Sequence, residues 1–244
     1  YSQAQLALRH ADDAILAARE ARLSGHVSVG MAPSTASVLG VPFINAMRES
    51  YPDVRLHLVE SLSGNLERMI NTRQLDLAIV FQQEKILRWS ARPVLEERLF
   101  LIGTHALLAS LPDDPVSPDQ LTTLPLIMPS QGHGLRGRLE AVCQQHNLSV
   151  EVVADIDGLA LLMQAVRSGL GATLQPGAAI SHLDHQALRV IGIANPVLSR
   201  PNFLVSLSDD ELTPAGLAAR VILSKVMRQL VESDRWPGAT LYVN

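Results

Sequence analysis

The sequence predicts an α/β protein of two lobes with a leading α-helix. Short apolar strands alternate with helical stretches, which is the pattern of layered α/β folds. This alternation occurs in two successive series, and a last helix follows the second one. The length of 244 residues suffices for two hydrophobic cores. We therefore expect two lobes with a cleft between them.

The leading helix is expected over residues 1–24, a stretch without Gly or Pro that is rich in good helix formers. Its apolar residues recur at alternating spacings of four and three, as in a coiled-coil seam or a helix docked on a neighbour. The seam predicts self-association through Ala4, Leu8, Ala11 and Ile15. The helix lacks a capping pattern ahead of residue 1, so we interpret it as the end of a longer helix.

The first series of elements reads as β-α-β-α-β. Period-two or continuous apolar runs predict strands at 26–32, 54–59 and 75–81. Helices are expected from Pro33 and after 61–63. Such a series forms a parallel sheet with right-handed crossovers.

The second series is expected to hold more strands than helices. Its helices are predicted from about 118, over 135–146 and over 159–169, and the last helix over 214–231. The predicted strands are 99–103, 125–128, 150–154, 172–174, 188–191 and 203–207.

Composition argues against nucleic-acid binding by these residues. The net charge is −4, and two Trp, three Tyr and four Phe offer little for base stacking. A single cysteine, no signal-peptide pattern and no apolar run of about 18 residues indicate a cytoplasmic protein without a membrane span.

Sequence motifs of common α/β enzymes are missing. The chain has no phosphate loop, no dinucleotide fingerprint and no serine-hydrolase elbow. We interpret His182 and His185 as solvated surface residues, Asp155 and Asp157 as strand-end or capping residues, and Cys143 as an inert core thiol. We expect no metal, no cofactor and no enzymatic activity.

Three polar turns stand between a predicted strand and the start of a helix. They comprise residues 32–35, 61–64 and 129–133, and each carries hydroxyl or amide side chains. Open α/β sheets bind ligands at this edge, where free N–H groups and the helix dipole favour an anion. The alternative is that these Ser and Thr residues only cap helices. We expect the three turns to converge on one cleft.

Four motifs in order resemble the successive signatures of LysR-type transcriptional regulators. They lie at residues 25–30, 74–79, 96–103 and 166–176. The segments 71–76 and 99–104 are, in addition, similar to the nitrogen assimilation control subgroup of that family. The resemblance extends from the leading helix to the last helix.

The resemblance implies a type 2 periplasmic-binding-protein-like effector domain of two subdomains joined by two crossover segments. Residues 1–24 match the end of the linker helix that pairs protomers. Residues 25–98 with 209–244 would form subdomain I, and 99–208 subdomain II. The DNA-binding winged helix-turn-helix of the family is missing from these residues, so DNA would be bound only through that absent part.

The resemblance further implies that the chain senses a small anionic metabolite in the interlobe cleft and forms a dimer or tetramer, with RNA polymerase left open as a partner. A free solute-binding protein of the same fold and an effector-independent regulator domain are the alternatives. The residues matching the effector-contacting positions are Ser34, Thr35, Ser63, Phe81, Ser130, Gln131, His133 and Gln175.

Overall fold

The computed structural model describes residues 23–81, 89–113, 115–131, 133–180, 187–194 and 198–242. The chain forms two compact units. Unit 1 comprises Tyr1–Glu96, Pro201–Trp236 and Thr240–Asn244, and unit 2 comprises Glu97–Arg200 and Pro237–Ala239. The predicted seam of Ala4, Leu8, Ala11 and Ile15 lies outside the described residues.

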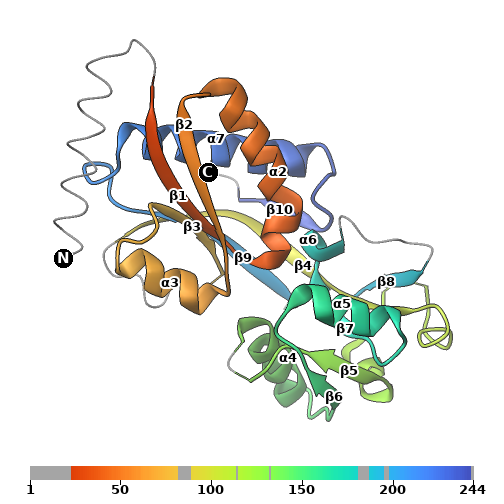
Figure 1. Ribbon diagram of the computed structural model, residues 1–244. Helices are drawn as coiled ribbons and strands as arrows, with labels where there is room; N and C mark the ends of the chain where they lie inside the picture. Colours follow the sequence, from red (N-terminus) through yellow and green to blue (C-terminus); the bar gives the residue numbers. More distant parts are fainter. Residues whose placement is uncertain are drawn as a thin grey trace. The chain divides into compact units, whose positions relative to one another are not determined.

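Unit 1 is built on a parallel sheet, which confirms the expected β-α-β-α-β series (Figure 1). Strand β1 pairs in parallel with β2 on one side and with β3 on the other. Strand β9 adds to the free side of β3 in the antiparallel direction. The elements in chain order are β1 (Gly25–Met31), α2 (Pro33–Ser50), β2 (Val54–Glu60), α3 (Ser63–Asn71), β3 (Leu77–Val80), β9 (Ser199–Ser206) and α7 (Pro214–Glu232).

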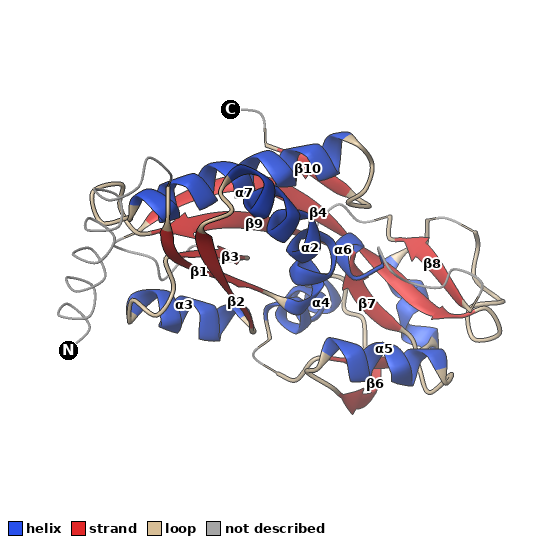
Figure 2. Ribbon diagram, turned by 45° about the horizontal axis from the view of Figure 1, so that its top comes forward, coloured by secondary structure: helices blue, strands red, loops and turns tan. Residues whose placement is uncertain are grey.

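Helices cover both faces of this sheet. Leu66 and Ile70 of α3 pack with Ala78, Val80 and Val205 in one buried cluster, which places α3 on that face. Helix α7 lies on the opposite face, and α2 packs against it (Figure 2). Gly30 of β1 permits the close approach of α3, because a Cβ there would lie 2.7 Å from a methyl carbon of Leu66 in that helix.

A buried carboxylate ties β1 to the entry of β3. Oδ2 of Asp76 accepts hydrogen bonds from the backbone N–H and the hydroxyl of Ser28, both at 2.7 Å. The Asp76 backbone N–H donates in return to Ser28 Oγ at 3.1 Å. This pairing gives the motif at 74–79 a structural reason, because the aspartate satisfies polar groups inside the sheet.

Unit 2 contains an antiparallel sheet and a separate two-stranded parallel sheet. Strand β4 pairs antiparallel with β7 and with β8, whereas β5 pairs in parallel with β6. Buried residues of α4 and α5 belong to two hydrophobic clusters. The elements are β4 (Ser90–Thr104), the 3-10 helix η1 (Pro118–Thr123), β5 (Pro125–Met128), α4 (Gly134–Gln145), β6 (Glu151–Asp155), α5 (Leu159–Arg167), β7 (Thr173–Pro176), α6 (Gly177–Ile180) and β8 (Leu188–Gly192).

The two long strands differ most from the prediction. Strand β4 begins at Ser90 and not at the predicted residue 99. The sequence did not indicate residues 90–98 as a strand, because they are charged and contain a proline; pairing with neighbouring strands holds them extended. Residues 203–206 of β9 pair with β3, and the compact unit 1 includes the chain from Pro201, whereas the sequence analysis places residues 99–208 in subdomain II. The short elements α6 and β10 (Ala239–Leu241) were not predicted.

Four helices end with the same backbone turn, in which the residue after the C-cap has a positive φ. The bonds from Arg73 N–H to Ile70 O and from Gln74 N–H to Met69 O show this turn after α3. The positive-φ residues of these four turns are Arg73, Asn147, Gly169 and Asp234. Only one of them is glycine, so glycine alone marks a minority of these helix ends in the sequence.

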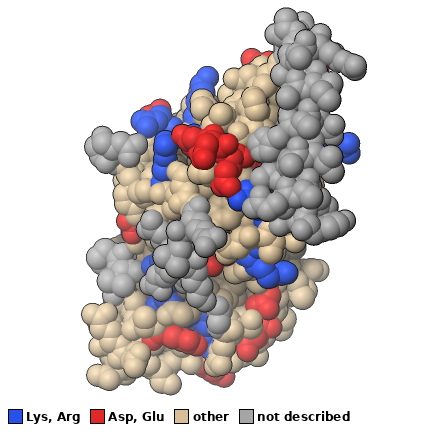
Figure 3. All heavy atoms as spheres, turned by 90° about the vertical axis from the view of Figure 1, so that its left-hand side faces the viewer, with Lys and Arg blue, Asp and Glu red and all other residues tan. Residues whose placement is uncertain are grey.

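The charged side chains on the surface agree with the small net charge of the sequence. Figure 3 shows acidic and basic side chains interspersed on the face that it presents, without a continuous basic surface among the described residues visible there. No helix within the described part of the chain is both long and apolar enough to cross a membrane.

Candidate functional site

In unit 1 the start of α2 presents polar groups at the carboxyl edge of the sheet. Its N-cap is Ala32, whose side chain cannot bond the first-turn N–H groups, and Pro33 occupies the first turn. Ser34 and Thr35 follow, and both are buried. The first turn holds no acidic residue. The positive end of the helix dipole is therefore not neutralised from within this turn.

Thr35 is the exceptional residue of this turn. Its side chain is 0% exposed, and its hydroxyl has no hydrogen-bond partner. A buried hydroxyl without a partner costs about 1–3 kcal/mol. An orphan hydroxyl of this kind at a helix start is suited to bind a ligand atom.

The other two predicted residues of unit 1 lie at the same edge of the sheet. Ser63 is the first residue of α3 and is half-buried, and the N-cap Leu62 makes no side-chain cap. Phe81 directly follows β3 and is half-buried. Since β1, β2 and β3 run in parallel, their carboxyl ends share one edge.

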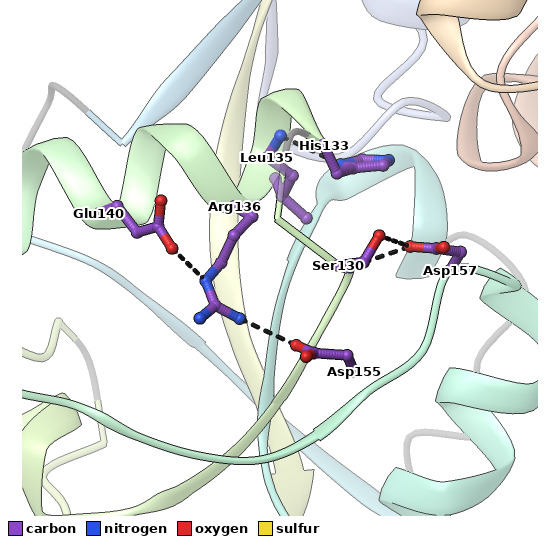
Figure 4. Close-up of polar contacts among 7 residues, drawn as sticks. All are labelled: Ser130, His133, Leu135, Arg136, Glu140, Asp155 and Asp157. Carbon is purple, nitrogen blue, oxygen red and sulfur yellow. Dashed lines mark hydrogen bonds and ion pairs between the residues drawn. The ribbon is translucent and has the colours of Figure 1, made fainter.

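In unit 2 the predicted donor Ser130 is already occupied by a carboxylate. Oδ1 of Asp157 accepts hydrogen bonds from the Ser130 backbone N–H at 2.9 Å and from its hydroxyl at 2.8 Å (Figure 4). These two bonds lower the pKa of Asp157. Asp157 therefore binds the turn after β5 and uses both hydrogen-bond donors of Ser130, whereas the N-cap of α5 is Gly158, which has no side-chain cap.

His133 is the N-cap of α4. Its ring Nδ1 accepts a hydrogen bond from the Leu135 N–H at 3.1 Å, which requires an unprotonated Nδ1. Burial lowers the pKa of His133, Asp157 opposes this effect, and Arg200 adds to it. His133 is thus held as a neutral imidazole that acts as a helix cap.

The remaining two predicted residues of unit 2 differ in exposure. Gln131 is exposed in the turn before α4. Gln175 is buried on β7, where its Nε2 lies 3.5 Å from Oγ1 of Thr173. Ser130 and His133 thus share one turn and the neighbour Asp157, whereas the hydrogen bond of Gln175 leads to its own strand.

A buried ion pair in unit 2 was missed by the sequence reasoning. Arg200 donates from Nε to Oε2 of Glu97 at 2.8 Å, and its Nη2 lies 2.7 Å from the same oxygen. Oε1 of Glu97 accepts the Ala178 N–H at 2.7 Å. In the sequence both residues look like ordinary charges next to a strand, and no local signal marks them as partners.

Among the described residues, no three His, Cys, Asp or Glu side chains form a group that could hold a metal ion. Asp155 forms an ion pair with Arg136, with 3.1 Å between Oδ1 and Nη1 (Figure 4). Cys143 is buried, and burial raises the pKa of its thiol, which agrees with an inert core residue. The predicted surface residues His182 and His185 lie outside the described residues.

Comparison with solved structures shows the fold. A reduced form of OxyR from N. meningitidis superimposes with a TM-score of 0.72 at 19% identity, covering 89% of this chain and 99% of that chain. The effector-binding domain of QuiR in complex with shikimate gives a TM-score of 0.72 at 17% identity, covering 84% and 98%. These similarities confirm the predicted periplasmic-binding-protein-like α/β fold.

Among characterised sequences, the chain is similar to nitrogen assimilation regulatory proteins. The nitrogen assimilation regulatory protein nac of Escherichia coli (strain K12) is 29% identical over 248 residues, which cover 97% of this chain and 78% of nac. The nac protein of Klebsiella aerogenes is 29% identical over 96% of this chain and 77% of its own length.

The family itself is settled by the match of the LysR substrate binding domain to residues 20–228. This match covers both compact units and confirms the resemblance seen in the sequence motifs. It also identifies the chain as part of a regulator and not as an enzyme. The chain belongs to the LysR family of transcriptional regulators, of which it contains the effector-binding domain.

Proposed function

We propose that this domain senses a small anionic metabolite and that the start of α2 binds its carboxylate. The observation that carries the proposal is the buried Thr35 hydroxyl, which lacks a partner at a helix start without a side-chain cap. N–H groups and the helix dipole attract an anion at such a position. The absence of an acidic residue from the first turn of α2 favours the same charge.

A relative of the same fold binds a ligand of this kind. QuiR was solved in complex with shikimate, which is a carboxylic acid. Ser34, Ser63 and Phe81 at the same edge of the sheet are proposed as further contacts. For unit 2 we keep Gln131, His133 and Gln175 as predicted contacts, whereas Ser130 contributes only lone pairs while Asp157 holds its donors.

The proposal is tested by calorimetry and thermal unfolding of the chain with small acids and with their amides. We expect the acids to bind and raise the unfolding temperature, while the amides do not. Thr35→Val replaces the hydroxyl by a methyl group of similar size and should abolish binding without loss of stability. Ser37→Ala is the control, because the Ser37 hydroxyl already donates to Pro33 O at 2.9 Å within α2. Equal binding by the Thr35→Val variant would contradict the proposal.

We further propose that the regulator works in the cytoplasm as a dimer or tetramer and binds DNA through a domain outside these 244 residues, with RNA polymerase as a potential further contact. The seam Ala4, Leu8, Ala11 and Ile15 supplies the proposed helix pairing. Leu8→Asp should shift the chain toward the monomer in sedimentation, with Arg9→Asp as the control at the neighbouring position. An unchanged assembly would assign self-association to other surfaces.

A second candidate function is regulation without an effector. The observation in its favour is that Asp157 already occupies both donors of Ser130, as a bound carboxylate would. In that case no acid binds the chain, and Thr35→Val changes only its stability. The same calorimetric experiment therefore separates the two candidates.

A further inference from the structure

The side chain of Asn202 is buried without any hydrogen bond. It is 0% exposed, and neither its amide oxygen nor its amide nitrogen has a partner. Among the described residues it is the only one in which two side-chain atoms are orphaned in this way. Buried polar groups nearly always have partners in folded proteins, so an orphan amide requires an explanation.

The strand register places Asn202 at the carboxyl edge of the sheet in unit 1. Phe203 of β9 pairs with Val80, the last residue of β3. One residue further along this register, Asn202 lies level with Phe81, just beyond the end of β3. Because β1 runs parallel to β3 with Gly30 opposite Ala78, the start of α2 lies at the same level.

Strand alternation decides which face of the sheet Asn202 is on. Phe203 packs against the cluster that contains the α3 residues, so its neighbour Asn202 points to the opposite face. That is the face covered by α7 and by α2, which packs on α7 (Figure 2). Asn202 and Thr35 therefore belong to one edge and one face of the same sheet.

The spacing of these two orphans suits a small metabolite. Strands β9 and β1 are separated by β3 alone, so they lie two strand spacings, about 10 Å, apart. A ligand of about six to ten heavy atoms that begins at α2 can span this distance to the position of Asn202. The amide offers it two donors and one acceptor, and it carries no charge.

We infer that Asn202 is a specificity-determining residue of the effector site and that it selects acids carrying a hydroxyl or amide group. The inference rests on the proposed function, since α2 would hold the carboxylate. The amide of Asn202 would then bind the second polar group of the ligand. An acid without such a group leaves the amide unpaired and binds more weakly.

The test uses matched acids that differ in their hydroxyl groups. Shikimate is compared with cyclohex-1-ene-1-carboxylate, and malate with succinate, by titration calorimetry on the whole chain. In at least one of the two pairs, we expect wild-type protein to bind the acid with hydroxyl groups about tenfold more tightly than the matched acid that lacks them. One well-formed hydrogen bond allows a difference of this size. In Asn202→Leu this ratio should fall below about threefold, while the simple acid still binds.

Stability of the ligand-free chain provides a second measurement. Asn202→Leu removes an unpaired amide and keeps the branching and the number of heavy atoms, so its unfolding temperature should rise by about 2–4 °C. Asn45→Leu, at an exposed position of α2, is the matched control and should change neither quantity. Asn202→Ala repeats the binding test in case leucine does not fit.

The outcomes separate the two hypotheses. If wild-type protein binds acids and the hydroxyl preference persists in both Asn202 variants, the inference is wrong and the proposed function stands. Binding without any hydroxyl preference in wild-type protein also refutes the inference alone. If wild-type protein binds none of the four acids, the proposed function fails and the inference fails with it.

Discussion

Glu97 and Arg200, the first and last residues of the long segment of unit 2, form a buried ion pair. Glu97 lies on β4 and Arg200 on β9, the two strands that continue into unit 1. The Glu97 carboxylate also accepts a hydrogen bond from the N–H of Ala178, the second residue of α6. Burial lowers the pKa of Arg200, and Glu97 opposes this effect by favouring the charged guanidinium. The ion pair thus links β4 and β9 at the two ends of the long segment of unit 2.

Removing one partner of this pair should destabilise the chain strongly. Arg200→Met leaves a buried carboxylate uncompensated, and Glu97→Gln leaves a buried guanidinium, each at a cost of about 3–5 kcal/mol. The double variant should regain much of this loss, because no unpaired charge remains. Urea unfolding of the three variants measures the coupling. Additive losses in the double variant would contradict a direct pair.

His133 should make the stability of the chain depend on pH in a defined window. Its pKa in the folded protein is lowered, mainly by burial. The unfolded chain therefore binds a proton first as the pH falls below about 6.5. The stability that the neutral cap contributes is full above this pH and is lost as the pH falls through the lowered pKa. His133→Asn keeps a capping oxygen at every pH and should remove this loss. Urea unfolding between pH 7.5 and 5, with the exposed His146→Asn as control, provides the measurement.

Asp157 should contribute a second pH dependence at more acidic values. Ser130 lowers its pKa through two hydrogen bonds, so the carboxylate stabilises the folded state above the unfolded pKa of about 3.9. This contribution is lost as the pH falls through the lower pKa of the folded protein. Asp157→Ala should flatten the stability profile between about pH 5 and 3, whereas the exposed Asp53→Ala should not. A titration of Asp157 by NMR at an ordinary pKa would argue against these bonds in solution.

Arg73 combines backbone strain with an ion pair. It follows the C-cap of α3 with φ of 58°, a conformation that favours glycine, and its side chain pairs with Glu211. In the Glu211→Gln background, Arg73→Gly should raise the free energy of unfolding by about 1 kcal/mol, because only strain is relieved. In wild-type protein the gain should be smaller, since the ion pair is lost as well. Equal effects in both backgrounds would show that the pair contributes nothing to stability.

Secondary structure was largely predictable, because hydrophobic period and helix starts are local properties. The strand at 54–59 and the helix starts at Pro33 and Pro214 needed no knowledge of their partners. Strand β4 was underestimated because its first half is charged and is held extended by pairing. Helix ends at Arg73, Asn147 and Asp234 carry no glycine, so their turns could not be identified from the sequence.

The candidate site was predicted in part. The strand-to-helix turns identified Thr35, Ser130 and His133, since they follow from the order of the elements along the chain. The role of each was decided by distant residues. Asp157 takes the donors of Ser130 from 27 positions away, and His133 proved to be a cap. Asn202 was not found at all, because an asparagine on a strand has no sequence signal that tells whether it is paired.

By itself the sequence determined the family, the α/β order of elements and the turns that face the edge of each sheet, because these depend on local pattern and on the order of motifs. The tertiary structure decided which polar groups are satisfied. It placed Glu97 and Arg200 in an ion pair and brought the Ser130 donors to the Asp157 carboxylate. It left Thr35 and Asn202 buried without partners. The physical reason is that a hydrogen bond requires two groups within about 3 Å, and for residues far apart in the chain only strand register and helix packing set that distance.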